Sequence, residues 1–416
     1  MRRLALAALT TVTAVTTTVA VTGAGEGASA SVAVSQVYRV PDSGRFTVRG
    51  HGWGHGHGMS QHGAQGAARK GLNAQQILAF YYPGTRRTIA ADGLIRVLIT
   101  ADTSDPVAVR PRSGLSVRDL GPDGTGTTTY SLPTTVGART WRVRASTADR
   151  DRVQYYDGKA WRAWRPGGRA TLLGRGELFS PDGPVALIVP GATVLYRGAL
   201  RSAAPTPGST ARDTVNVLSL DDYVKGVIPA EMPASWEPAA VRAQAVAART
   251  YAVYDREAHP TRYYDTCDTT MCQVYRGVAV EDSRSNDAAD RTAGQIRTLD
   301  GKAIFSQFSS SNGGWTSQGS VAGKPAPYLA HKQDPYDGWA GNTNHSWSTT
   351  LAAGTISRAY PTIGRLLRVR VRQREGGGDW QGRVEKLVLV GTKGSKQLSG
   401  DEFRSRFGLK STWFRL

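Results

Sequence analysis

Two stretches of the chain carry residue types that could do chemistry. The first, GHGWGHGHGMSQHGA at 50–64, holds four of the seven histidines of the chain, namely His51, His55, His57 and His62. In an extended conformation the first three would share one side and could hold a metal ion. No Asp or Glu lies in the stretch to orient such ligands, and no Lys-Ser or Lys-Thr follows the glycines as in a phosphate loop. Its glycines alternatively allow the backbone to pass close to another segment or to an extended ligand.

The second stretch, GVIPAEMPASWEPAAVRAQAVAARTYA, surrounds one glutamate. Glu231 lies between Pro229 and Pro233, beside Met232 and Trp236. Two prolines fix the backbone of a turn before a helix, which gives the side chain a rigid mount. Apolar neighbours raise the pKa of a carboxyl group and keep it protonated, as a general acid requires. The alternative is an exposed or capping glutamate near a helix start, and composition alone leaves both interpretations open.

The two cysteines of the chain lie close together in YDTCDTTMCQVY. Cys267 and Cys272 can close a small loop as a disulfide if the protein is in an oxidising compartment. A zinc site would need two further ligands, which the neighbouring residues do not supply. We therefore expect the disulfide.

The N-terminal segment predicts such a compartment. Residues 1–30 have a basic start, an apolar stretch and an Ala28-Ser29-Ala30 ending, which is typical of a secretory signal cleaved after Ala30. A retained membrane anchor is the alternative, although the threonines make a poor span. The formal net charge of +19 predicts attraction to polyanions. Outside the cell these are anionic wall polymers, so we expect a protein associated with the cell wall and no nucleic-acid partner; a merely solvated basic surface is the alternative.

The elements that must position these residues suggest more than one lobe. A chain of 416 residues exceeds the usual size of one domain. We expect a mixed α/β (α+β) fold with a long alanine-rich helix and surrounding strands, plus a β-rich lobe or insertion. The expected boundaries are 31–94 for the glycine–histidine segment with short helices packed on the core, 95–185 for the β-rich lobe, and 186–416 for the core with the Glu231 motif.

Local signals place several helices and strands. Ser60 is a predicted N-cap of one short helix, and Asn73 with Gln76 forms a predicted capping box of a second. The long helix is expected to open at Pro238, because proline is favoured at the first helical position. Short alternating runs between glycine and proline turns predict strands over 95–202.

Several of these stretches resemble motifs of the SpoIID/LytB family. The segment around Glu231 is similar to the family signature, and other matches are GHGWGHGHGMSQHGA followed by ILAFYYPGT, YDTCDTTMCQVYRG, FSSSNGGWTS and LSGDEFRSRFGLKSTWF. Sporulation members of this family are lytic transglycosylases, which cut peptidoglycan glycan strands stripped of stem peptides and leave 1,6-anhydro-N-acetylmuramic ends. The resemblance implies a secreted lyase of this kind, with Glu231 as its catalytic acid/base and with no metal or other cofactor.

The resemblance also implies a set of substrate-binding residues. The arginine of the family signature falls on Arg249, which could hold the lactyl carboxylate that stripped strands expose, or could pair with a nearby aspartate. The single histidine usual in the glycine-rich motif aligns with His55, which makes the other histidines of the cluster incidental. The remaining implied substrate-binding residues are Gln61, Gln273, Tyr275, Gly313 and Gly314.

Two departures from the family pattern matter. The glycine–histidine motif normally lies near the C-terminus, so this chain resembles a circular permutation, which requires termini that lie close together. Some relatives have a histidine, with zinc binding suggested, where this chain has Met271. That difference favours the disulfide.

The expected chemistry needs a single carboxyl group. Hydrolysing glycosidases use two, whereas in a lytic transglycosylase the C6 hydroxyl of the muramic acid attacks the anomeric carbon in place of water. Two other functions stay open: a non-catalytic wall-binding enhancer of an N-acetylmuramoyl-L-alanine amidase, as LytB-type members are described, and a zinc hydrolase built on the histidines. Trp315 and Tyr328 are expected either to line the glycan groove or to belong to the core.

Overall fold

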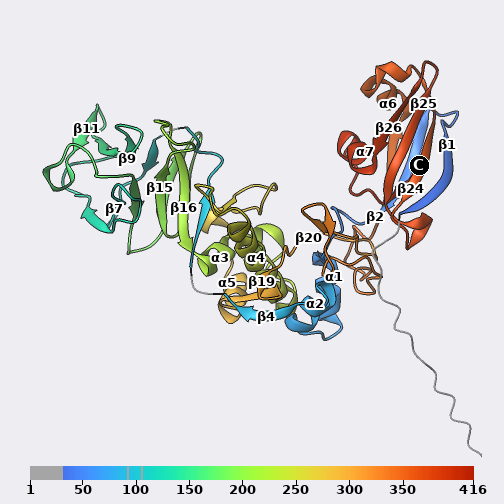
Figure 1. Ribbon diagram of the computed structural model, residues 1–416, viewed down its shortest axis with the longest axis horizontal. Helices are drawn as coiled ribbons and strands as arrows, with labels where there is room; N and C mark the ends of the chain where they lie inside the picture. Colours follow the sequence, from blue (N-terminus) through green and yellow to red (C-terminus); the bar gives the residue numbers. More distant parts are fainter. Residues whose placement is uncertain (1–30, 91–92, 105) are drawn as a thin grey trace, which may run out of the picture.

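The computed structural model describes residues 31–90, 93–104 and 106–416, so the predicted signal over 1–30 lies outside the described residues. Figure 1 shows three lobes in a row. We name them the β lobe (94–219), the helical lobe (53–90 and 220–345) and the terminal lobe (31–52 and 346–416). The predicted mixed α/β fold is confirmed.

The β lobe is built from two antiparallel sheets and one added short parallel strand. The seven-stranded sheet has the order β17 (Thr266–Cys267), β5 (Leu94–Leu98), β16 (Asp213–Ser219), β15 (Ala199–Ala203), β12 (Gly176–Phe179), β7 (Ser116–Asp119) and β8 (Thr128–Ser131). The six-stranded sheet has the order β11 (Trp161–Trp164), β10 (Asp151–Tyr156), β9 (Thr140–Ala145), β6 (Val107–Val109), β13 (Val185–Val189) and β14 (Ala192–Tyr196). Alternating apolar residues such as Trp141, Val143 and Leu178 are fully buried, as the period-2 pattern predicts.

The lobe boundaries differ from those expected from the sequence. The β lobe extends past residue 185, because β13 to β16 complete both sheets and leave fewer open edges. The segment 31–94 is divided: β1 and β2 join the terminal lobe, whereas its two helices and the short strands β3 and β4 join the helical lobe. Turn signals locate strands in a sequence, but they do not reveal which distant strand each one pairs with.

The helical lobe surrounds one buried helix. Its helices are α1 (Gln61–Arg69), α2 (Ala74–Tyr81), α3 (Leu220–Glu231), α4 (Pro238–Ala258) and α5 (Ser283–Arg291). Helices α1, α2, α3 and α5 all pack on α4, whose alanines, such as Ala243 and Ala247, are fully buried and permit close approach. Within the described ranges, no helix combines the length and apolar character that a membrane crossing needs.

Short strands complete the helical lobe, and the predicted caps are confirmed. The strands are β3 (Met59–Ser60) beside β20 (Phe308–Ser309), β4 (Arg86–Ile89) with β18 (Gln295–Leu299) and β19 (Lys302–Ala303), and β21 (Ser320–Val321) with β22 (Lys324–Pro325). The Ser60 side chain accepts a hydrogen bond from the Gly63 N–H, Asn73 and Gln76 form the capping box of α2, and Pro238 opens α4.

The terminal lobe joins the two ends of the described chain. Its four-stranded sheet has the order β1 (Val32–Arg39), β24 (Leu366–Arg374), β25 (Val384–Gly391) and β26 (Ser395–Ser399). Its three-stranded sheet has the order β23 (Ser346–Ala352), β2 (Arg45–His51) and β27 (Phe414–Arg415), and its helices are α6 (Ala353–Ala359) and α7 (Gly400–Phe407). Gly50 pairs with Phe414, and the His51 N–H donates to the Trp413 carbonyl at 2.9 Å. The glycine–histidine motif and the C-terminal motif are therefore neighbours, as a circular permutation requires.

Candidate functional site

Glu231 is held at the end of a buried helix. It is the last residue of α3, where sequence reasoning expected a turn between two prolines. Pro229 instead lies inside the last helical turn, which ends when the Met232 N–H donates to the Ile228 carbonyl at 2.8 Å. Met232 is only 1% exposed and anchors the turn, so the half-buried Glu231 side chain has a rigid base.

The surroundings of Glu231 favour its protonated form. Burial raises the pKa of Glu231 above its usual value, and this is the largest effect. Two hydrogen bonds oppose it and lower the pKa: the Val274 N–H donates to Glu231 Oε1 at 3.1 Å, and the Gln61 side chain forms the second. Since burial dominates, the carboxyl group carries a proton over a wider pH range than an exposed glutamate.

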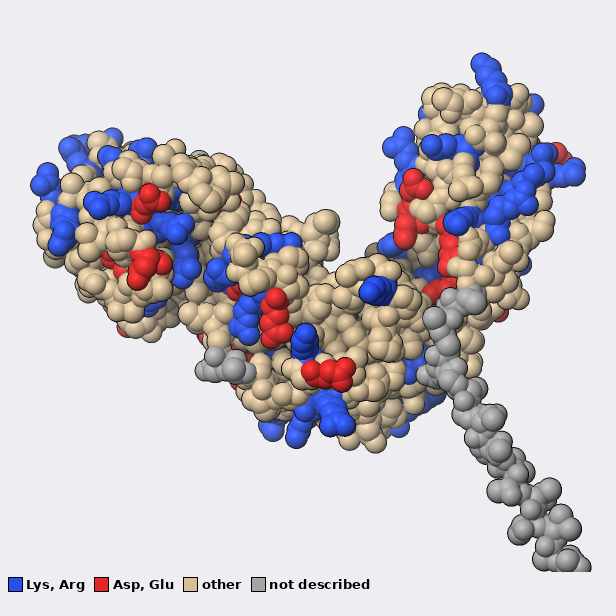
Figure 2. All heavy atoms as spheres, viewed as in Figure 1, with Lys and Arg blue, Asp and Glu red and all other residues tan. Residues whose placement is uncertain are grey.

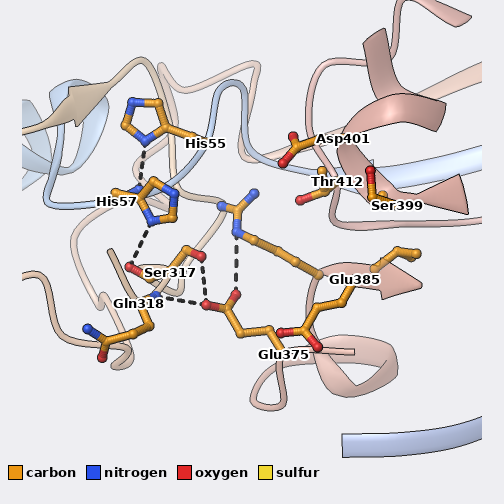
Figure 3. Close-up of a pocket in the computed structure, with 12 residues that line it drawn as sticks. His55, His57, Ser317, Gln318, Glu375, Glu385, Ser399, Asp401 and Thr412 are labelled. Carbon is orange, nitrogen blue, oxygen red and sulfur yellow. Dashed lines mark hydrogen bonds and ion pairs between the residues drawn. The ribbon is translucent and has the colours of Figure 1, made fainter. Parts of the chain in front are cut away.

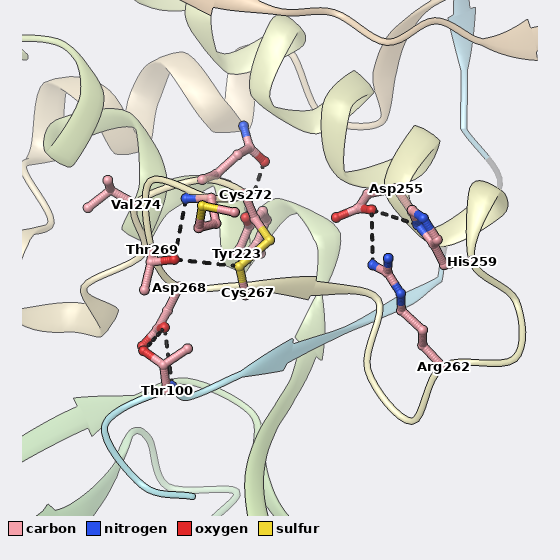
Figure 4. The surroundings of a disulfide bond; sticks show 12 residues. Thr100, Tyr223, Asp255, His259, Arg262, Cys267, Asp268, Thr269, Cys272 and Val274 are labelled. Carbon is pink, nitrogen blue, oxygen red and sulfur yellow. Dashed lines mark hydrogen bonds and ion pairs between the residues drawn. A yellow bond between two sulfur atoms is a disulfide. The ribbon is translucent and has the colours of Figure 1, made fainter. Parts of the chain in front are cut away.

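The predicted disulfide is confirmed, and it holds the loop that carries Val274. Cys267 and Cys272 are bonded, and Figure 4 shows the loop between them beside Tyr223. The Asp268 carboxylate accepts from the Thr100 hydroxyl at 2.7 Å, which ties the loop to the end of β5. The loop position therefore sets where the Val274 N–H meets Glu231.

Helix α1, from the glycine–histidine motif, packs against the Glu231 turn. Gln61 is buried, and its Nε2 donates to Gln244 Oε1 on α4 at 3.5 Å. One turn later, Gln65 Oε1 accepts from the Glu237 N–H at 2.8 Å. The structure thus brings together Glu231 and Gln61, which the sequence analysis placed in the same site from two separate motifs.

An aromatic cluster includes Trp236, which lies in the segment that follows Glu231. We use this name for His62, Trp236 and Trp339, all partly exposed. The ring centroids of His62 and Trp236 are 4.9 Å apart, and the two tryptophan rings meet at 90° with centroids 6.2 Å apart. Trp236 is five residues from Glu231 in the chain, and His62 follows Gln61 directly. Such rings offer apolar faces that suit the C–H faces of a sugar.

Two buried amide donors flank the carboxyl group. The Nε2 groups of Gln244 and Gln273 are buried, with no hydrogen-bond acceptor among the described residues. Gln244 contacts Gln61, and Gln273 precedes Val274, so both neighbour the two groups that bind Glu231. A buried unpaired donor costs about 1–3 kcal/mol. Both side chains are buried, at 0% and 1% exposure, so these amides belong to the packing around Glu231.

Arg249 lies elsewhere in the helical lobe. Its guanidinium is fully buried and bonds Asp221 at 2.6 Å, with further bonds to the carbonyls of Ala289 and Gln295. Asp221 is at the start of α3 and Glu231 is at its end, ten residues or about 15 Å along the helix. Arg249 therefore pairs with an aspartate, which was the alternative to substrate binding. Its positive charge is held at the opposite end of α3 from Glu231.

Tyr275 is packed in the core, and part of its ring lines a pocket of about 550 Å³ together with Val274. It is 3% exposed, and its hydroxyl donates to Asn216 Oδ1 at 2.8 Å. The rings of Tyr196 and Tyr223 pack beside it at centroid distances of 5.8 and 5.2 Å. Tyr275 therefore supports the segment that carries Gln273 and Val274.

His55 lines a different pocket, of about 390 Å³, between the helical and terminal lobes (Figure 3). Its Nδ1 accepts from the His57 N–H at 2.9 Å, and the two rings stack at 4.8 Å. Burial lowers the pKa of His55 to about 3, so the ring is neutral. Glu375 and Arg383 are on the other side of the pocket, and Glu231 does not line it.

Gly313 and Gly314 form a crossing of two backbones. Both have positive φ, and a Cβ on Gly313 would lie 2.7 Å from the Gly52 nitrogen. The Gly313 N–H donates to the buried carboxylate of Asp337 at 3.1 Å, and that carboxylate also accepts from the Ser60 hydroxyl at 2.6 Å. The glycines of the first motif thus serve close packing of the chain against itself.

The four clustered histidines lie in three environments. His51 contacts Asp379 at 3.2 Å and stacks near Trp413, His55 and His57 stack on each other, and His62 joins the aromatic cluster.

Sequence reasoning missed Gln244, Trp339 and Asp337. Gln244 had one signal, because it is a single amide within an alanine-rich helix that must be buried on several sides. Trp339 and Asp337 lie in DPYDGWAGN, a segment without a recognisable spacing, and only the fold brings it to the site. Of the two aromatic residues expected at a groove or core, Tyr328 is 8% exposed and lies in the core, and Trp315 is half-buried beside His331.

Comparisons with known proteins agree with the motifs. Residues 209–299 match the SpoIID family, described as Stage II sporulation protein. The chain is 41% identical over 131 residues to a protein of Bacillus subtilis (strain 168) named "Amidase enhancer", covering 31% of this chain and 17% of that protein. It is 28% identical over 222 residues to "Stage II sporulation protein D" of Bacillus amyloliquefaciens, covering 49% of this chain and 62% of that one.

A further relative is an uncharacterized protein of Brachyspira hyodysenteriae, 44% identical over 117 residues, which are 28% of this chain and 32% of that protein. The matches therefore cover between 17% and 62% of the lengths of these three relatives. Residues 209–299 include Glu231, Arg249 and both cysteines, so the family match covers the α3–α4 part of the site. Over the matched segments the chain is therefore similar to the SpoIID family and to relatives named for sporulation and for amidase enhancement.

Proposed function

We propose that the protein is a secreted lytic transglycosylase that cleaves the glycan strands of peptidoglycan, with Glu231 as its single general acid/base. One observation carries this proposal: Glu231 is half-buried and burial raises its pKa, in a segment of the chain that also carries Trp236 of the aromatic cluster. A hydrolysing glycosidase needs a second carboxylate, whereas the proposed reaction needs Glu231 alone.

The proposed reaction uses the Glu231 carboxyl group twice. It donates its proton to the glycosidic oxygen as the bond to the anomeric carbon of N-acetylmuramic acid breaks. The resulting carboxylate then accepts the proton of the C6 hydroxyl, whose oxygen bonds to the same carbon and closes the 1,6-anhydro ring. Glu231 ends protonated again, and no water is consumed. General acid–base assistance of this kind contributes roughly 10²–10⁴-fold.

The hydrogen bonds to Glu231 suit both states of the carboxyl group. The Val274 N–H and the Gln61 amide stabilise the carboxylate once the proton has left, while burial favours the acid beforehand. Trp236 and Trp339, both partly exposed, supply ring faces for the sugars. We infer from the resemblance to the sporulation members of the family that strands stripped of peptides are the preferred substrate.

The test is mass spectrometry of peptide-free glycan strands after incubation with the mature protein. Anhydro-muramic ends, formed by the wild type and lost in Glu231→Gln, are the expected products. Reducing ends would contradict the proposal, because they require water as the attacking group.

A second candidate is a wall-binding enhancer of an N-acetylmuramoyl-L-alanine amidase. It is favoured by the relative named "Amidase enhancer" and by the +19 formal charge. Such a protein would bind strands and accelerate a purified wall amidase equally well as wild type and as Glu231→Gln. Either function would place the protein outside the cytoplasm, at the cell wall.

A further inference from the structure

The outer face of the four-stranded sheet in the terminal lobe carries a row of cations. We call it the basic sheet face; it consists of Arg39 on β1, Arg368, Arg370 and Arg372 on β24, and Lys386 on β25. The alternate residues Val369, Val371 and Leu387 are fully buried in the core of the lobe with Ile356 of α6 and Phe403 of α7. Both helices therefore cover the inner face, and Figure 1 shows β1 on the side away from α7.

The charges on this face have no acidic partner. None of its five cations takes part in an ion pair within the described ranges, although acids elsewhere pair with many arginines. The exposed or half-buried positions opposite or beside this row include Ala33, Ser35 and Val37 on β1 and Val388 and Val390 on β25, none of them acidic. The one acid of these two strands, Glu385, lies beside Lys386 and accepts a hydrogen bond from the Ser31 hydroxyl at 2.5 Å. Figure 2 shows a run of lysine and arginine side chains across the right of this lobe, with acidic side chains on its left and lower parts and one at its right edge.

The fold forces like charges together on this face. Arg39 lies directly opposite Arg368 in the β1–β24 pair, and like charges in that position destabilise a sheet. Along β24, three arginines at alternate positions repeat at about 6.7 Å. The Nε groups of Arg368 and Arg370 are buried, with no hydrogen-bond partner among the described residues. A bound anion would relieve the repulsion and accept from these donors.

We propose that the basic sheet face binds a linear anionic wall polymer whose charges are phosphodiesters. Four of the five cations are arginines, whose planar guanidinium matches phosphate oxygens in two-point contacts. The row of cations follows one strand, so it fits an extended chain better than a compact anion. Val37 is 48% exposed beside Arg370 and offers an apolar strip for the backbone of such a polymer. This binding is independent of Glu231 and would hold the protein at the wall.

The experiment measures binding of the mature protein to fluorescently labelled poly(glycerol phosphate) by anisotropy across a salt series. The test variant is Arg368→Gln/Arg370→Gln/Arg372→Gln. The matched control is Arg86→Gln/Arg110→Gln/Arg169→Gln, which removes three exposed arginines from the other lobes. We expect at least a tenfold loss of affinity in the test variant and less than a twofold loss in the control. By analogy with single-stranded nucleic acids, the slope of log affinity against log salt should fall by roughly 2, since each phosphate contact contributes about 0.7.

Several outcomes would overturn the proposal. Equal losses in both variants would mean that net charge alone drives binding, and equally tight binding of poly-glutamate would exclude phosphodiester recognition. Binding of single-stranded DNA more than tenfold tighter than the wall polymer would assign the face to nucleic acid. Thermal unfolding checks folding: the test variant should melt no lower than wild type, because it relieves repulsion. Glu231→Gln should bind the polymer normally, which separates this proposal from the catalytic one.

Discussion

Gln61 and Glu231 share a hydrogen bond across 170 residues of sequence, and this contact joins the glycine–histidine motif to the motif around Glu231. Gln61 is oriented by its bond to Gln244 on α4, and α1 is fixed again by the contact of Gln65 with the Glu237 N–H. The first motif therefore acts on the carboxyl group through α1 rather than through its histidines.

Substituting Gln61 should change the pH dependence of the reaction. Its hydrogen bond lowers the pKa of Glu231, so Gln61→Ala removes a stabilising contact to the carboxylate and raises that pKa further. The protonated acid then persists to higher pH, and the alkaline limb of the kcat/KM profile moves up. Gln397→Ala, an exposed glutamine of β26, is the control and should leave the profile in place. A downward shift in Gln61→Ala would contradict the assigned role.

Removing the disulfide should lower the stability of the protein and raise the pKa of Glu231. Replacing both cysteines in Cys267→Ser/Cys272→Ser opens a short loop and should cost roughly 2 kcal/mol of unfolding free energy. The Val274 N–H becomes less well placed, so the pKa of Glu231 rises and the alkaline limb moves up, as in Gln61→Ala. Chemical denaturation and a pH–rate profile measure the two effects. An unchanged unfolding free energy together with an unchanged pH–rate profile would show that the loop holds its position without the disulfide.

Gly313 should tolerate no side chain. Gly313→Ala places a Cβ 2.7 Å from the Gly52 nitrogen at a φ of +76°, and we expect a loss of about 2–4 kcal/mol in stability. Gly323 has a similar φ of +74° with nothing within 4 Å of its added Cβ, so Gly323→Ala isolates the backbone cost. The difference between the two variants in thermal unfolding measures the close contact. Equal losses would mean that the crossing of the two backbones is not tight.

The aromatic cluster should contribute to glycan binding. Trp339→Ala removes one ring face near Glu231, and we expect KM for glycan strands to rise about 3–10-fold with little change in the pH profile. Trp53 is 49% exposed and lies outside the cluster, so Trp53→Ala serves as the control. Identical KM values in the two variants would remove the cluster from the substrate site.

Local features of the site could be predicted from the sequence, and distant contacts could not. The caps at Ser60 and Asn73, the helix start at Pro238 and the disulfide all depend on residues close in the chain. The pairing of β1 with β24 depends on residues more than 300 positions apart, for which one sequence carries no signal.

The local sequence also did not determine the surroundings of two further residues, Pro229 and Arg249. Pro229 was expected in a turn, yet packing of α3 on α4 carries the helix past it to Glu231. For Arg249 the sequence left two roles open, substrate binding and pairing with an aspartate, and Asp221 binds it within the helical lobe. In both cases tertiary packing decided the outcome.

The central claim is that Glu231 alone supplies the proton for glycan cleavage. The direct measurement is mass spectrometry of peptide-free strands treated with wild type, Glu231→Gln and Glu237→Gln, the last being an exposed glutamate of the same turn. We predict anhydro-muramic ends from wild type and Glu237→Gln, and at least a hundredfold fewer from Glu231→Gln. Undiminished anhydro products from Glu231→Gln would contradict the account.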